Sequence, residues 1–405
     1  MNKQMLDKAI ALVPKIKAIT NEVQSKHIQR GDVAKATWLS LVSGRPAFFL
    51  GSPGIDKTGT IQSLAKRIDG AVFYDALMPT IVSVEQLLVE STSIEEVPVD
   101  NGGKQIRTRD QLGRAAMAHL MFADEIWKAE PRVLQTLIDL SKGDGVRHEG
   151  TMVKTPLLAF LAASNELPDP EGNLGAVWSR MTIRVLVNPL DRGGKMSLVK
   201  SRLNRDRDKT GTTTASDSLK LEDVDTLRNA RPHVEVSDSI IETVLDILQE
   251  LLDDQSTDFQ WAWADDRRFG RIFDVMQANA LLDGRTQVGK QDLVVLEWLL
   301  WDTPEHIAVI KAQIAPYTRT PLNDAQEAVD ALLSPSGTVE IVRKGDRTKG
   351  VQALTQCEAC LEEVKRLKGE AGTDTAMIAE IDKLVSQIET IKAEVIAVVT
   401  GMKKN

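Results

Sequence analysis

The chain has 405 residues, of which 42% are hydrophobic and 27% are charged, and its net charge is −8. This composition is that of a globular protein, and the length allows two or three domains. The negative charge argues against a general nucleic-acid surface, although it leaves room for a basic pore in an assembled ring. No apolar run approaches the length of a membrane span, and residues 1–8 lack a signal-peptide pattern, so we expect a cytoplasmic protein.

Residues 1–43 are predicted to form helices, because apolar side chains recur at helical spacing between Ile10 and Ile19. Pro14 should then lie near the start of a helix or at a kink. Asp32 is a candidate N-cap for the second helix of this segment.

The next element is a strand that ends in a glycine-rich turn. After Phe48, Phe49 and Leu50 come Gly51, Ser52, Pro53, Gly54, Ile55, Asp56, Lys57 and Thr58. This order resembles a phosphate-binding P-loop, G-x-x-x-x-G-K-[ST], whose backbone N–H groups face phosphate oxygens at a helix start. Lys57 would reach the β- and γ-phosphates, and the Thr58 hydroxyl would bind Mg²⁺. The alternative is an ordinary turn before a helix.

Asp56 departs from the P-loop motif, since it occupies the position of the second glycine. Its carboxylate would lie near the phosphates. We therefore expect weakened nucleotide binding unless this side chain points outward.

Residues 71–118 combine strand and helix patterns. A strand is predicted over 71–74, a helix over 84–89, and two strands over 94–99 and 104–109. The turn residues between these two strands, 100–103, read Asp-Asn-Gly-Gly and indicate an inserted β-hairpin.

Two further apolar runs end in polar residues. Leu120–Ala123 lead into Asp124 and Glu125, where Asp124 suits Mg²⁺ and Glu125 can polarise an attacking water. Residues 156–163 (PLLAFLAA) precede Asn165, whose amide can hydrogen-bond the same water. Without a P-loop upstream, we would interpret these acids as solvated and Asn165 as a turn residue. A short hairpin is expected near 148–156, and a strand over 183–187.

Strands that alternate with helices predict a parallel, doubly wound α/β sheet. A polar linker with some helix is expected over 191–236, with a flexible loop over 209–218. Helical apolar spacing then continues from 237 to 316. A second linker, 317–350, is expected to hold a short strand over 339–343.

Residues 351–405 are predicted to form a helical hairpin with a coiled-coil seam. The seam residues of its second helix are Met377, Ile381, Leu384, Ile388, Ile391, Val395 and Val398. The seam could close on itself or on a partner. Cys357 and Cys360 form a lone C-x-x-C inside the helical apolar pattern, which favours core packing over zinc or redox chemistry.

Together these motifs resemble an AAA+ ATPase. The runs GSPGIDKT, FADEIWKAEP, AASNELP, AVWSRMTIRV and ADDRRFGRIFDVMQANALLDGR resemble the MoxR family, specifically its RavA branch, over roughly residues 28–315. The expected domains are N-terminal helices (1–43), an AAA+ αβα nucleotide-binding domain (44–190), a linker (191–236), an all-helical lid domain (237–316), a linker (317–350) and the C-terminal helical hairpin (351–405).

The resemblance assigns roles to matching positions. Lys57 and Thr58 correspond to the Walker A pair, Asp124 and Glu125 to Walker B, and Asn165 to sensor 1.

Three arginine assignments follow from the same resemblance. Arg180 corresponds to the arginine finger, which acts on nucleotide in a neighbouring subunit, with Arg184 as the fallback. Arg267, beside Arg268, corresponds to sensor 2. Taken alone, each would be interpreted as surface charge.

The implied function is an ATP- and Mg²⁺-dependent ATPase that forms a homo-oligomeric ring, expected to be a hexamer, and remodels a protein client in a chaperone-like way. A von Willebrand factor A-domain protein is the first candidate partner. Asp56 and the coiled-coil tail motivate an alternative, a nucleotide-gated scaffold with little hydrolysis. A DNA-dependent motor is disfavoured by the negative charge.

Overall fold

The computed structural model describes residues 2–98, 104–141, 145–148, 151–169, 174–207, 218–254, 266–334, 337–371 and 375–400. The chain forms two compact units, Met1–Ile314 and Ala315–Asn405. No helix among these described residues is long and apolar enough to cross a membrane.

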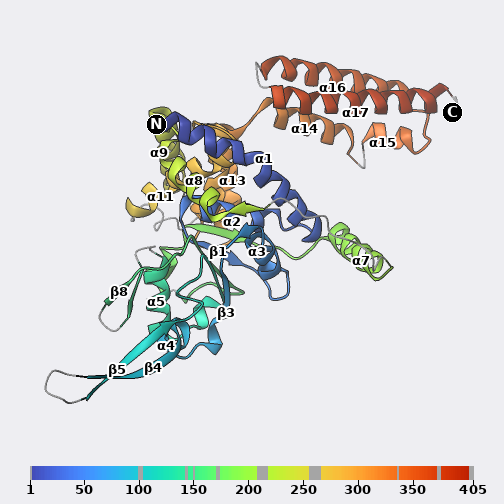
Figure 1. Cartoon of the computed structure of the whole chain (residues 1–405). Helices are drawn as coiled ribbons and strands as arrows, with labels where there is room; N and C mark the ends of the chain where they lie inside the picture. Colours follow the sequence, from blue (N-terminus) through green and yellow to red (C-terminus); the bar gives the residue numbers. More distant parts are fainter. Residues whose placement is uncertain are drawn as a thin grey trace. The chain divides into compact units, whose positions relative to one another are not determined.

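A five-stranded sheet lies at the centre of the N-terminal unit (Figure 1). Its neighbouring strands all run parallel, in the order β10-β1-β9-β6-β3. The strands are β1 (Ala47–Leu50), β3 (Phe73–Leu77), β6 (Leu120–Asp124), β9 (Ala159–Ser164) and β10 (Ile183–Leu186). The three central strands are buried almost throughout, which explains their continuous apolar runs. The predicted parallel α/β sheet is confirmed.

The register of the sheet brings three strand ends to one edge. Leu50 of β1 lies beside Ser164 of β9, and Asp124 of β6 lies beside Ala163 of β9. The segments that follow these strands carry the P-loop, the acidic pair and Asn165. Ligands of open parallel sheets bind at this carboxyl edge.

Four helices pack together beside the sheet: α1 (Asn2–Lys26), α2 (Gly31–Ser43), α3 (Lys57–Ala65) and α8 (Leu221–Ala230). Pro14 lies inside α1, far from its start. The helix tolerates the lost N–H because its buried face, which includes Val13, Ile16 and Ile19, holds it in place. The expected N-cap at Asp32 is wrong, since Arg30 precedes α2 and Asp32 lies in its first turn.

Two antiparallel hairpins extend from the unit, as predicted. The first pairs β4 (Val89–Pro98) with β5 (Lys104–Leu112), and the second pairs β7 (Val146–His148) with β8 (Thr151–Val153). The predicted turn residues 100–103 lie outside the described residues. The remaining short elements here are β2 (Ile68–Asp69), η1 (Met78–Thr80), α4 (Val84–Leu88), η2 (Ile126–Lys128), α5 (Pro131–Ser141) and α6 (Gly175–Trp178).

The segment expected to be a linker with some helix, 191–236, holds α7 (Arg192–Arg207), β11 (Leu219–Lys220), α8 and η3 (Arg231–His233). Helix α8 contacts α1 and α2. It buries Val224, Leu227 and Ala230, one residue every three positions, among polar neighbours. Most of the expected flexible loop, residues 209–217, lies outside the described residues.

The described part of the N-terminal unit beyond residue 237 is mainly helical, as predicted. Its elements are α9 (Asp238–Asp253), α11 (Asp266–Leu282), η4 (Lys290–Val295), α12 (Leu296–Leu299) and α13 (His306–Thr318). Helix α9 buries Ile240, Val244, Ile247 and Leu251 along one face.

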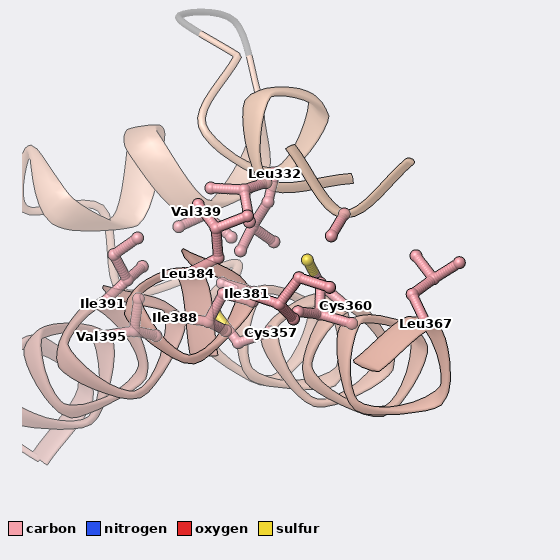
Figure 2. Packing of buried hydrophobic residues seen from close by; sticks show 14 of the residues in the cluster. Leu332, Val339, Cys357, Cys360, Leu367, Ile381, Leu384, Ile388, Ile391 and Val395 are labelled. Carbon is pink, nitrogen blue, oxygen red and sulfur yellow. The ribbon is translucent and has the colours of Figure 1, made fainter. Parts of the chain in front are cut away.

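After α13, the described residues of the C-terminal unit form α14 (Pro321–Leu332), α15 (Thr338–Arg343), α16 (Gly350–Glu370) and α17 (Thr375–Thr400). Ion pairs between Lys392 and Glu358 and between Lys368 and Asp382 fix α16 and α17 as antiparallel. Figure 2 shows their seam packed together with residues of α14 and α15. The seam therefore closes within the chain.

Both cysteines lie in this core, as predicted, and burial raises the pKa of each thiol. The strand expected over 339–343 is wrong. Those residues form α15, which buries Val339 and Val342 at helical spacing. β-Branched residues suggested a strand, but the described residues offer no neighbouring strand, and packing decides the outcome.

Candidate functional site

A cavity of about 850 Å³ lies at the carboxyl edge of the sheet. The residues that line it come from the P-loop, the ends of β6 and β9, the α1–α2 connection and α7. They include Gly51, Pro53, Gly54, Ile55, Asp56, Lys57, Thr58, Asp124, Glu125 and Asn165. This volume is in the range of small-molecule sites, so the fold gathers the predicted phosphate and Mg²⁺ residues at one cavity.

The P-loop backbone requires its two glycines. A Cβ on Gly51 would lie 2.5 Å from the Val187 carbonyl oxygen, and Gly54 has a φ of +76° with open space around it. Asp56 also adopts the left-handed conformation, at φ 65°, immediately before α3. Aspartate reaches this region more readily than most residues, so the loop keeps its shape without the second glycine.

The Lys57 ammonium lies within the loop that precedes it. It donates to the Gly51 carbonyl oxygen at 2.6 Å and to the Ser52 carbonyl oxygen at 3.2 Å. Burial lowers the pKa of Lys57, and the Asp124 carboxylate opposes this effect. The cation is thus held in the cavity close to the acid expected to bind Mg²⁺.

The acidic pair follows β6 with a sharp change of direction. Glu125 has a φ of 53°, an uncommon conformation for a residue other than glycine. Its backbone N–H donates to Asp124 Oδ1 at 3.0 Å, and its own carboxylate pairs with Lys128 at 3.0 Å. The turn places both carboxylates at the cavity, one fixed by the backbone and one engaged by a surface lysine.

Asn165 is exposed at the cavity, one residue after β9. The backbone N–H of Gly51 donates to the Ser164 carbonyl oxygen at 3.0 Å, so the P-loop and the Asn165 turn are joined directly. This bond explains why two motifs more than a hundred residues apart share one site.

The donor set fits a magnesium nucleotide. Thr58 and Asp124 offer the oxygen ligands that Mg²⁺ prefers, and Mg²⁺ typically takes only one or two carboxylates plus phosphate oxygens. The described residues contain no cluster of three or more His, Cys, Asp or Glu side chains that would form an all-protein metal site.

The candidate arginines behave differently from one another. Arg180 is partly buried and is not among the residues that line the cavity. Arg184 is fully buried: it pairs with Asp302, donates to the carbonyl oxygens of Met181 and Trp178, and stacks on the Trp178 ring. The fallback finger role of Arg184 is therefore wrong, because its guanidinium is fully used inside the fold.

The sensor 2 candidates lie at the start of α11. The side chain of Arg267 lies outside the described residues. Its neighbour Arg268 is buried and donates to the Leu299 carbonyl oxygen at 2.9 Å and to Asp302 at 3.2 Å. Arg268 is thus a structural residue of the helical region.

Sequence reasoning missed the contributions of α1, its connection to α2, and α7. His27 and Arg30 line the cavity, and Arg30 donates to the Ile55 carbonyl oxygen at 2.6 Å. Lys195 and Arg202 of α7 line it too, in the segment that polar composition made look like a linker. The basic residues of α7 were the sequence feature that could have indicated its place at the cavity.

Comparison with known proteins gives two family matches. Residues 14–229 match the profile described as "MoxR domain in the MoxR-vWA-beta-propeller ternary systems", and residues 239–314 match an AAA lid domain. A solved structure, that of a proposed ATPase of Cytophaga hutchinsonii, is similar to the fold at a TM-score of 0.58 and 16% identity. The similarity covers 77% of this chain and 97% of that one.

Three curated proteins are similar in sequence. Two uncharacterized proteins of Methanocaldococcus jannaschii are each 25% identical, over 93% and 91% of this chain and 96% of their own lengths. The structural protein ORF618 of Acidianus two-tailed virus is 27% identical over 57% of this chain and 36% of its own length. The Methanocaldococcus alignments are long enough to include most of the C-terminal unit.

Proposed function

The chain belongs to the MoxR family of AAA+ ATPases, and on this premise we propose that it hydrolyses ATP with Mg²⁺ in a homo-oligomeric ring that remodels a protein client. One observation carries the proposal: Lys57, Thr58, Asp124, Glu125 and Asn165 meet at a single cavity. We also propose a hexamer and a cytoplasmic location. The RavA branch stays a prediction, because the matching profile is that of the MoxR-vWA-beta-propeller group.

Each residue of the cavity has a role in this proposal. Magnesium-bound ATP, when present, supplies the phosphoryl group that water attacks. The backbone N–H groups at the start of α3 and the Lys57 ammonium would hold the phosphates. Thr58 and Asp124 would hold Mg²⁺, Glu125 would accept a proton from the water, and Asn165 would orient that water.

Glu125 must exchange one partner for another during this cycle. Its carboxylate pairs with the exposed Lys128, and a general base needs hydrogen-bond reach of the water. An exposed ion pair is weak enough for this exchange.

The position of Arg180 supports the proposal of a ring. A guanidinium that stabilises charge on a transferred phosphoryl group must reach the nucleotide, yet Arg180 is not among the residues that line the cavity of its own chain. We therefore assign it to the nucleotide of a neighbouring copy. Arg267 is proposed to contact nucleotide from the helical region.

An exposed apolar face of α7 is a candidate contact surface for a second copy of the chain. Met196, Val199 and Leu203 are 57%, 55% and 54% exposed, on a face next to the one that lines the cavity. Contiguous exposed apolar residues mark interaction sites, and this one adjoins the cavity that Arg180 of the neighbour has to reach.

The family description suggests the client, because it names ternary systems that contain a vWA protein. We propose a von Willebrand factor A-domain partner on that basis. The scaffold alternative, with little hydrolysis, is motivated by Asp56 and the coiled-coil tail, although the tail's seam packs within the chain. It predicts ATP binding without turnover.

The test is steady-state ATP hydrolysis as a function of protein concentration. We expect wild-type specific activity to rise with concentration and to vanish when EDTA removes Mg²⁺. Glu125→Gln should bind ATP but turn over about 100-fold more slowly or worse. Arg180→Ala should lose roughly 10³-fold, and Val199→Glu should lose the concentration dependence.

Arg366→Ala, a change in the C-terminal unit, is the matched control and should behave as wild type. Normal turnover by Glu125→Gln would remove Glu125 from its role. ATP binding without wild-type turnover would favour the scaffold.

A further inference from the structure

The Asp56 carboxylate is engaged by the segment just after α1. Its Oδ2 lies 2.7 Å from His27 Nδ1, and the imidazole Nε2 lies 2.7 Å from the Ser63 hydroxyl of α3. An ionised carboxylate only accepts hydrogen bonds, so Nδ1 carries the hydrogen of the first bond. His27 therefore bridges the end of the P-loop and the helix that follows it.

Gly59 makes room for the same carboxylate. A Cβ at position 59 would lie 2.2 Å from Asp56 Oδ1 and 3.4 Å from His27 Cε1. Asp56 thus folds over the first turn of α3, in space that only glycine leaves open. The P-loop motif makes no demand on this position, so the glycine is explained by Asp56 and not by phosphate binding.

Arg30 places a positive charge near this carboxylate. The buried Arg30 is hydrogen-bonded to the Ile55 carbonyl oxygen at 2.6 Å, one residue before Asp56. Burial lowers the pKa of Arg30, and the Asp56 charge opposes that effect. The negative charge at the unusual P-loop position is thus balanced from the α1–α2 connection.

We propose that His27 is a positioning residue for the nucleotide site, which, together with Gly59, holds the Asp56 carboxylate over α3 and away from the phosphate-binding backbone. This inference rests on the proposed ATP binding. It explains how a P-loop with an acid in place of a glycine can bind nucleotide: the left-handed backbone is retained, and the added carboxylate is hydrogen-bonded to His27.

The test is the affinity for Mg·ATPγS, measured by calorimetry on the full chain. We expect His27→Ala and Gly59→Ala each to weaken binding roughly tenfold, the effect of one unpaired charge about 10 Å from the phosphates at a protein surface. His27→Asn, whose amide can donate from near the Nδ1 position, should keep most of the affinity. The kcat at saturating ATP should change far less than the affinity.

A second substitution shows whether a loss of affinity comes from the Asp56 charge or from a disturbed fold. In His27→Ala or Gly59→Ala, the added change Asp56→Gly should return the affinity to that of Asp56→Gly alone, because no carboxylate is left to restrain. Asp56→Asn should act similarly, since it removes the charge and keeps the size. Alanine favours helices over glycine, so Gly59→Ala should not unfold α3. Gly369→Ala, a helical glycine in open space, is the control and should bind as wild type.

The outcomes separate this inference from the function on which it rests. Wild-type affinity in His27→Ala, or a double variant as weak as His27→Ala, would overturn the positioning role. If neither the wild type nor Asp56→Gly bound nucleotide, the proposed ATPase function would fail first, and this inference with it.

Discussion

Arg184 and Asp302, 118 positions apart in the chain, form an ion pair in which the arginine is completely buried. Arg268 contacts the same carboxylate, and Trp178 donates to it at 3.0 Å. These contacts join the sheet strand β10 to the helical region through one aspartate. The guanidinium of Arg184 also packs 3.8 Å from the centre of the Trp178 ring.

Removal of this aspartate should destabilise the N-terminal unit strongly. Asp302→Ala leaves two buried guanidinium groups without their shared partner, and a broken buried pair typically costs about 3–5 kcal/mol. Urea unfolding followed by tryptophan fluorescence measures the change. Lys311→Ala, which breaks an exposed ion pair with Glu297, is the control and should cost less than about 0.5 kcal/mol. Equal effects in both variants would contradict the structural importance of Asp302.

The same aspartate should make the folding stability depend on pH in a defined way. Burial acts to raise the pKa of Asp302, but the charges of Arg184 and Arg268 outweigh it and hold the pKa below its ordinary value. A group of this kind stabilises the fold above its unfolded-state pKa of about 4 and loses that contribution as the pH falls through the folded-state pKa. The stability difference between wild type and Asp302→Asn should therefore be constant from about pH 5 to 7 and shrink below about pH 4. A difference that grows in acid would show that the carboxylate is not held ionised by the two arginines.

Lys128 should restrain Glu125. The lysine is exposed and pairs with the carboxylate at 3.0 Å. Because the pair would compete with the water that we propose Glu125 polarises, Lys128→Ala should raise basal ATP hydrolysis by about two- to fivefold, as expected for a weak surface pair. Lys344→Ala, which removes a comparable exposed pair with Glu340, should leave the rate unchanged. A slower Lys128→Ala enzyme would mean that the lysine assists Glu125 instead.

Local sequence patterns predicted the central parallel sheet and placed the P-loop, the acidic pair and Asn165 at the ends of its strands. The P-loop, the acidic pair and Asn165 each follow a short apolar run, and parallel strands bring such ends to one edge. The resemblance ranked Arg180 ahead of Arg184 as the arginine finger, but sequence alone left Arg184 as a fallback. Both follow Trp178 within six residues, and only the contact of Arg184 with Asp302, far along the chain, removes it from the surface.

The wrong predictions were based on local composition, whereas tertiary packing determined the structure of these segments. Residues 191–236 looked like a linker with only some helix because polar residues dominate, yet Val224, Leu227 and Ala230 supply a narrow buried face for α8. Val339 and Val342 looked like part of a strand, although their spacing of three suits the helix that buries them. His27 carried no motif at all, because its importance depends on a carboxylate 29 positions away.

The closed seam of the C-terminal unit also decides what that unit can offer to another molecule. Its heptad residues are used within the chain, and many described side chains on its outside are charged, such as Glu363, Arg366, Glu370 and Lys383. Attraction between charges exposed to water falls off beyond about 8 Å at physiological ionic strength. A partner that docks on these helices would therefore bind by contacts that added salt weakens, and its release should be controlled more easily by ionic conditions than by temperature.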